Sequence, residues 1–192
     1  MNELRAFIAI EIPDVIKTAI ARQTAILQVA CGGAVRWVTP ANMHLTLKFL
    51  GGISPTKVEP LSQMLQNICQ KQSPFEISVS GAGTFPYLQR PRVLWVGLNS
   101  PPDLERLQRR IETVAMQLGF KREERLFSAH LTIGRVRQQI TVPELDRLQK
   151  ALTQPLVGEM GKFSPSAVIL FKSELRPAGA LYTMLFNAPL GG

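Results

Sequence analysis

His44-Leu45-Thr46-Leu47 and His130-Leu131-Thr132-Ile133 are the two stretches that decide how this chain is organised. They contain both histidines of the 192-residue sequence, and in each stretch Leu follows the histidine and Thr stands two residues after it. Side chains i and i+2 of a β-strand project from the same face. Each stretch therefore predicts a strand with His and Thr on one face and apolar residues turned toward a core.

The segments around these two strands repeat one order of elements. Residue alternation and helical spacing predict strand, helix, histidine strand, helix and strand in the first half, and the second half repeats this order with one more strand. The expected strands are 4–12, 35–38, 44–50, 75–79, 92–98, 130–136, 167–172 and 181–186, and the expected helices are 15–31, 54–68, 100–119 and 143–152. This weak duplication predicts an α+β fold of two similar lobes related by pseudo-two-fold symmetry, with antiparallel sheets facing a central groove and helices on the outside. No Pro- or Ser-rich linker separates the halves, so residues 1–192 are expected to form a single bilobal domain.

The composition is that of a basic globular protein. The formal net charge is +8, with 45% hydrophobic and 19% charged residues. The charge favours an anionic partner such as a nucleic acid, a nucleotide or a membrane surface. No apolar run approaches the roughly 18 residues of a membrane span, and the first residues lack a signal-peptide pattern, so we expect a cytoplasmic protein with no membrane partner. Cys31 and Cys69 are too few for a disulfide scaffold or a structural zinc site, which predicts two reduced, buried thiols.

The two His/Thr pairs predict phosphoryl chemistry if the lobe symmetry brings them together. One imidazole can remove a proton from the attacking oxygen while the other protonates the leaving oxygen, and both roles suit a side chain whose unperturbed pKa is about 6.5. Hydroxyls of Thr46 and Thr132 can hydrogen-bond the non-bridging phosphoryl oxygens. A half-buried structural histidine is the alternative for either stretch alone. The matched pair favours His44 and His130 as catalytic residues, without saying which is the acid.

At these residues the chain resembles the two-histidine phosphoesterases, specifically the RNA 2',3'-cyclic phosphodiesterases that are also called 2'-5' RNA ligases. The segments that carry the resemblance are 5–10, 37–40 with 44–51, and 127–135. Ala129 stands where proline is expected and Ala41 where glutamate is common. The resemblance implies metal-independent hydrolysis of a 2',3'-cyclic phosphate to a 2'-phosphate, with His44 as the acid that protonates the departing 3'-oxygen and His130 as the base that activates water. It also implies reverse, ATP-independent 2'-5' ligation.

Two further side chains are candidates for phosphate contacts. The resemblance favours Arg135, which a regular strand would place on the face opposite Thr132 and which a bulge at Gly134 would turn inward. Lys48 is expected on the catalytic face, two residues after Thr46, either steering phosphate or simply solvated.

The expected partner is RNA with 2',3'-cyclic phosphate ends, transfer RNA fragments among them, and the protein is expected to be a monomer. No third histidine or flanking carboxylate stands at ligand spacing, so neither a metal nor a cofactor is expected. Two alternatives stay open: a phosphodiesterase for a small cyclic nucleotide or a 2'-5' oligonucleotide, and a non-catalytic protein that binds RNA ends.

Overall fold

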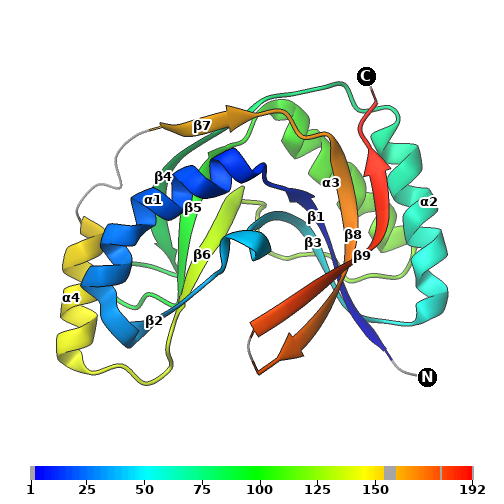
Figure 1. Ribbon diagram of the computed structural model, residues 1–192. Helices are drawn as coiled ribbons and strands as arrows, with labels where there is room; N and C mark the ends of the chain where they lie inside the picture. Colours follow the sequence, from blue (N-terminus) through cyan, green and yellow to red (C-terminus); the bar gives the residue numbers. More distant parts are fainter. Residues whose placement is uncertain (1–2, 154–158, 178, 192) are drawn as a thin grey trace.

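The computed structural model describes residues 3–153, 159–177 and 179–191, so the outermost positions of the expected domain, 1–2 and 192, lie outside it. The strands are β1 (Leu4–Glu11), β2 (Val35–Trp37), β3 (His44–Ile53), β4 (Ile77–Phe85), β5 (Val93–Asn99), β6 (His130–Val136), β7 (Glu159–Phe163), β8 (Ala167–Arg176) and β9 (Gly179–Pro189). The helices are α1 (Asp14–Cys31), α2 (Val58–Cys69), α3 (Pro102–Gln117) and α4 (Val142–Thr153). Over the described residues, all nine strands belong to one antiparallel sheet in the order β7-β4-β5-β6-β3-β1-β8-β9, with β2 paired to β6 (Figure 1).

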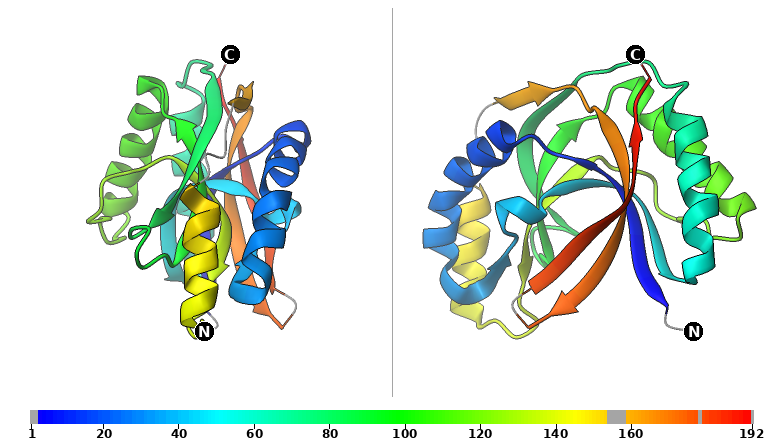
Figure 2. Two further views of the ribbon diagram at one scale, coloured as in Figure 1. Left: turned by 90° about the vertical axis from the view of Figure 1, so that its left-hand side faces the viewer. Right: turned by 45° about the vertical axis from the view of Figure 1, so that its right-hand side comes forward.

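The sheet is curled, and its helices lie on the outer side. The right-hand view of Figure 2 shows α1 and α4 on one flank and α2 and α3 on the other. This arrangement confirms the expected α+β class, the antiparallel pairing and the outer helices. Strand β7 was not expected, because its five residues include Gly161 at φ +113° and show no clear alternation.

The two lobes do not coincide with the two halves of the sequence. One lobe contains β1, β3, β8 and β9, and the other contains β2, β4, β5, β6 and β7. Strand β4 from the first half pairs with β5, and β8 from the second half pairs with β1. Helix α1 likewise follows β1 but packs on β2 and β7, whereas α3 follows β5 but packs on β3 and α2. The duplicated units are therefore interlocked.

The main core lies between the sheet and its helices. Strands contribute Ile8, Leu45 and Leu131, and helices contribute residues such as Leu61 and Leu104, all of them at most 1% exposed. Burying apolar side chains of this size stabilises the fold by about 1.5–3 kcal/mol each. The opposite face of the sheet, which bears the histidines, carries the smaller cluster of Phe7, Ala9, Ile169 and Phe171 with Tyr182.

Candidate active site

The histidine strands meet at the junction of the two lobes. Strands β3 and β6 pair antiparallel at Leu45 and Leu131, and both leucines are buried in the main core. In that register His44 stands opposite Thr132, and Thr46 stands opposite His130. All four side chains project from the face away from Leu45 and Leu131, which we call the histidine face. In a regular ladder, diagonal neighbours such as His44 and His130 lie about 7–8 Å apart, with their Cβ atoms somewhat closer.

Both imidazole rings are held by the same local hydrogen bond, from Nδ1 to a nearby backbone carbonyl. Nδ1 of His44 lies 2.9 Å from the carbonyl oxygen of Asn42, and Nδ1 of His130 lies 2.7 Å from that of Ser128. A carbonyl oxygen only accepts hydrogen bonds, so Nδ1–H is the donor in both cases and Nε2 is left for proton exchange. In each motif the acceptor stands two residues before the histidine. The two halves of the site are therefore equivalent at the level of the ring anchor.

The surroundings of His44 are aromatic, and the residue is half-buried. Its ring centroid lies 4.7 Å from that of Phe7 and 5.1 Å from that of Tyr182, which presents an edge-on ring. Burial lowers the pKa of His44; the hydrogen bond to Asn42 opposes this shift, and the positive charge of Arg135 adds to it. Burial also raises the pKa of Tyr182, and Arg135 counteracts that effect. Arg135 therefore acts electrostatically on both groups.

His130 has a different set of neighbours. Its ring lies 5.0 Å from Phe85 in an edge-on arrangement, and Phe85 in turn lies 5.4 Å from Trp95. Trp95 is in register with Thr132 on β5 and β6, so the two side chains share a face. Phe85 therefore lies directly beside the imidazole of His130.

A bulge decides where Arg135 points. On β6, Gly134 pairs with Leu94 but Thr132 pairs with Trp95, so one extra residue interrupts the ladder between them. Ile133 and Gly134 are both buried, and Arg135 is exposed. The bulge returns Arg135 to the histidine face, in agreement with its effect on His44. The sequence allowed Arg135 to lie on either face of the strand, depending on a bulge at Gly134. The structure has the bulge, and Arg135 lies on the histidine face.

A matching bulge on β3 overturns the expectation for Lys48. Here Ile8 pairs with Lys48 and Ala9 with Thr46, which leaves one extra residue in β3. Lys48 is consequently 4% exposed on the core side. Its Nζ donates to Glu112 Oε1 and to the Lys121 carbonyl, both at 2.6 Å. Lys48 is therefore neither a phosphate-steering group nor a solvated lysine.

Several residues of the site carried no recognisable sequence signal. Phe7 and Tyr182 come from β1 and β9, far from His44 in the chain. The Asn42 side chain donates to the Ala180 carbonyl at 2.8 Å, which ties the β8–β9 hairpin to the turn before His44. The alternation of β1 and β9 could indicate strands but could not indicate that their aromatic residues surround this ring.

The other titratable groups do not enlarge the site. Cys31 and Cys69 are free and buried, and burial raises the pKa of Cys69 to about 11. Within the described ranges there is no group of three or more His, Cys, Asp or Glu residues that could hold a metal ion. A membrane-spanning helix is likewise not found among the helices the structure describes.

Comparisons with known proteins point to one group of enzymes. A family model described as LigT like Phosphoesterase matches the chain twice, over residues 10–95 and 96–182. An RNA 2',3'-cyclic phosphodiesterase of Methanothermobacter thermautotrophicus is 34% identical over 181 residues, covering 94% of this chain and 96% of that protein. A second protein of that name, from Archaeoglobus fulgidus, is 31% identical over 179 residues. The aligned region covers 93% of this chain and 96% of that protein.

Solved structures agree with this result. The crystal structure of E. coli LigT complexed with 3'-AMP superposes with a TM-score of 0.77 at 27% identity, over 99% of each chain. A Thermus thermophilus protein superposes with a TM-score of 0.81 over 98% of each chain, and at 24% identity it shows the fold alone. The two matches of the family model divide the chain between β5 residues 95 and 96, which agrees with the duplication of elements.

Proposed function

The chain belongs to the LigT-like phosphoesterase family, and on that premise we propose that it hydrolyses the 2',3'-cyclic phosphate ends of RNA to 2'-phosphates by acid–base catalysis. The observation that supports this most is the mirrored pair of His and Thr residues at the β3–β6 junction, with both rings anchored through Nδ1. A basic chain of net charge +8 suits a polyanionic substrate.

The reaction follows from the two free Nε2 atoms. Nε2 of His130 takes a proton from water as the water oxygen attacks phosphorus, and the P–O3' bond breaks. Nε2–H of His44 gives its proton to the departing 3'-oxygen, leaving a 2'-phosphate and a 3'-hydroxyl. Lowering its pKa makes the His44 imidazolium a stronger acid, which suits this role. Because two imidazoles carry both proton transfers, the scheme needs no metal. An RNA 5'-hydroxyl in place of water gives a 2'-5' linkage without ATP.

The remaining polar groups bind the phosphate in this scheme. Thr46 and Thr132 each stand opposite a histidine, so their hydroxyls can hydrogen-bond the two non-bridging oxygens. Arg135, exposed on the histidine face, supplies a charge-assisted contact to the same oxygens. Replacing any one of these three side chains is expected to weaken binding of the transition state more than binding of the substrate, because negative charge on the non-bridging oxygens grows during attack.

The decisive test is product analysis of a short RNA that ends in a 2',3'-cyclic phosphate, incubated in excess chelator. The parent protein should give a 2'-phosphate. His44→Ala and His130→Ala should each lower the rate at least about 100-fold, the lower range for one positioned acid or base. Arg22→Gln, an exposed change on α1, is the matched control and should retain full activity.

Other products would overturn the assignment. A 3'-phosphate product would contradict the proposed bond cleavage. Activity only on a small cyclic nucleotide or a 2'-5' oligonucleotide would keep the reaction type but assign the enzyme a different class of substrate. RNA binding without turnover, retained when both histidines are replaced, would establish a non-catalytic RNA-end-binding protein.

A further inference from the structure

A basic cavity lies between α2 and α3, on the side of the sheet away from the histidine face. Its volume is about 590 Å³, within the roughly 300–1,000 Å³ that small-molecule sites occupy. Helices α2 and α3 pack on β3, β8 and β9 from the outer side. The cavity is therefore separate from His44 and His130, and nothing in the proposed hydrolysis uses it.

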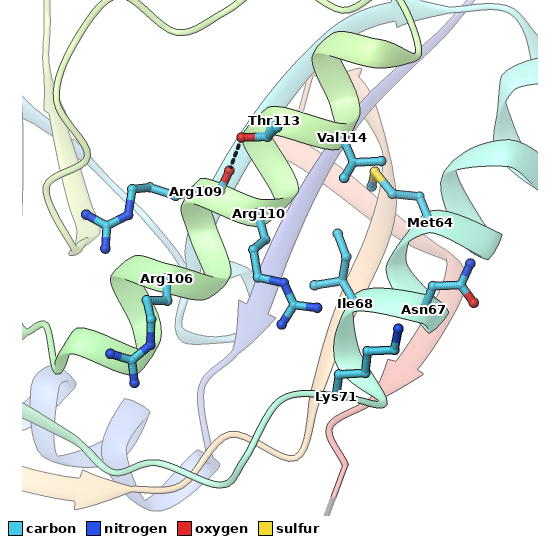
Figure 3. A pocket seen from close by; sticks show the side chains of 9 residues that line it. All are labelled: Met64, Asn67, Ile68, Lys71, Arg106, Arg109, Arg110, Thr113 and Val114. Carbon is cyan, nitrogen blue, oxygen red and sulfur yellow. Dashed lines mark hydrogen bonds between the residues drawn. The ribbon is translucent and has the colours of Figure 1, made fainter.

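The cavity combines a positive rim with an apolar floor. The cations are Lys71, Arg106, Arg109 and Arg110, the apolar groups are Met64, Ile68 and Val114, and Asn67 and Thr113 complete the lining. Among these described lining residues there is no Asp or Glu. Figure 3 shows the Arg110 guanidinium and the Lys71 ammonium reaching into the space between the two helices at one end, with Met64 and Val114 at the other end and Ile68 between them.

The cations of the cavity are only partly neutralised by carboxylates on the same helix. Arg106 and Arg110 are four residues apart on α3, a spacing at which like charges repel. Arg106 pairs with Asp103 at 2.7 Å, but within the described part of the chain no salt bridge engages Arg110, Arg109 or Lys71. A bound polyanion would relieve this repulsion, and guanidinium groups bind phosphate oxygens in a bidentate manner.

We propose that the cavity between α2 and α3 binds a phosphorylated nucleoside of mononucleotide size. Its phosphates pair with Lys71 and Arg110, the two cations that reach into the space between the helices. Its base lies on Met64, Ile68 and Val114, where the Asn67 amide can hydrogen-bond a base edge. The apolar floor distinguishes this ligand from inorganic phosphate, which would leave that floor uncovered.

The methionines allow the site to be tested residue by residue. With ¹³C-labelled methionine methyl groups, Met64 reports on the cavity. Met184, paired with Phe171 on the histidine face, reports on the catalytic side. A Met64→Leu variant assigns the Met64 resonance. The probes are ADP, adenosine and pyrophosphate, each titrated separately.

Titration with ADP should shift the Met64 resonance until the site is saturated. Pyrophosphate should cause a shift only at higher concentrations. Adenosine should cause no shift at the concentrations at which ADP saturates the site. The double variant Lys71→Gln/Arg110→Gln should weaken ADP binding at least tenfold. The control Arg22→Gln/Lys150→Gln removes the same charge from α1 and α4 and should leave it unchanged. Arg110→Lys, which keeps the charge but loses the bidentate contact, should bind ADP more weakly than the parent and more tightly than the double variant, and it guards against a folding defect.

Four results would overturn the proposal. ADP could shift Met184 and leave Met64 unmoved, which would place nucleotide binding on the histidine face alone. Adenosine could bind as tightly as ADP, or the double variant could bind ADP normally, and either result would remove the role of the cations. Pyrophosphate binding as tight as ADP binding would remove the role of the apolar floor. All of these outcomes are independent of whether cyclic phosphate hydrolysis is observed.

Discussion

Replacing Lys48 by methionine should destabilise the protein without touching catalysis. The Lys48 side chain is 3% exposed and its Glu112 partner 13%. Glu112 Oε1 accepts from Lys48 Nζ at 2.6 Å and from the Glu123 amide at 2.8 Å. Removing one partner of a buried pair costs about 3–5 kcal/mol. Because Glu112 Oε1 keeps the hydrogen bond from the Glu123 amide, we expect the lower end, about 3 kcal/mol. At about 2–4 °C per kcal/mol for a chain of this size, Tm should fall by roughly 6–12 °C.

Urea unfolding and a double-mutant cycle measure this cost. Lys48→Met/Glu112→Leu removes both charges, so it should recover most of the stability lost in Lys48→Met alone. Lys162→Met breaks exposed pairs with Glu76 at 3.6 Å and with Glu159 at 3.8 Å, and it should cost less than about 1 kcal/mol. At a temperature where Lys48→Met is folded, its kcat/KM should stay within a few-fold of the parent. A stability loss below about 1 kcal/mol together with weaker substrate binding would refute the reasoning, because it would place Lys48 on the histidine face.

Four further predictions concern the same framework. Arg135→Gln should raise the pKa of His44, measured by NMR titration of its imidazole, and Arg135→Lys should leave it unchanged; an unaltered pKa in Arg135→Gln would mean that the guanidinium does not act on the ring. The folded protein protonates His44 less readily than the unfolded chain, so its contribution to stability falls as pH drops through about 6.5, and Arg135→Gln should weaken that dependence. Gly134→Ala should cost about 1–3 kcal/mol in urea unfolding, because its Cβ would lie 2.6 Å from Val35 Cγ1, and an unchanged midpoint would contradict the tight packing there. The expectation of one domain over residues 1–192 predicts coincident far- and near-ultraviolet unfolding transitions, whereas two separated transitions would divide the chain.

The part of the site that could be predicted from the sequence is the part that depends only on residues close together along the chain. Alternation along a single strand placed His44 with Thr46 and His130 with Thr132, because i and i+2 share a face whatever the strand pairs with. The duplicated order of elements likewise followed from local periodicity. The exchange of β4 and β8 between the lobes did not, because it depends on which strands pair, and strand alternation is the same for any partner.

The faces on which Lys48 and Arg135 lie depend on the two bulges, and a bulge cannot be predicted from the sequence of one strand alone. Counting by two from Thr46 put Lys48 on the wrong face, because a ladder with one extra residue reverses the alternation after it. The same count put Arg135 away from the site unless a bulge intervened. Whether a strand bulges depends on its partner strand, here β1 for β3 and β5 for β6. The carbonyl anchors of the two rings were equally invisible, because any residue type can supply a carbonyl oxygen.

The two bulges also explain how a symmetric framework can support two different proton-transfer roles. Strands β3 and β6 have identical burial patterns along their first seven residues, so Phe49 occupies on β3 the place that Arg135 occupies on β6. Phe49 is 65% exposed and contacts Phe7 with ring centroids 6.5 Å apart. One lobe thus presents an aromatic ring, and the other a guanidinium, at equivalent positions. Since both imidazoles share the same Nδ1 anchor, the proposed division into acid and base rests on these unequal surroundings. The aromatic enclosure and the charge of Arg135 both act on His44 to favour release of its proton.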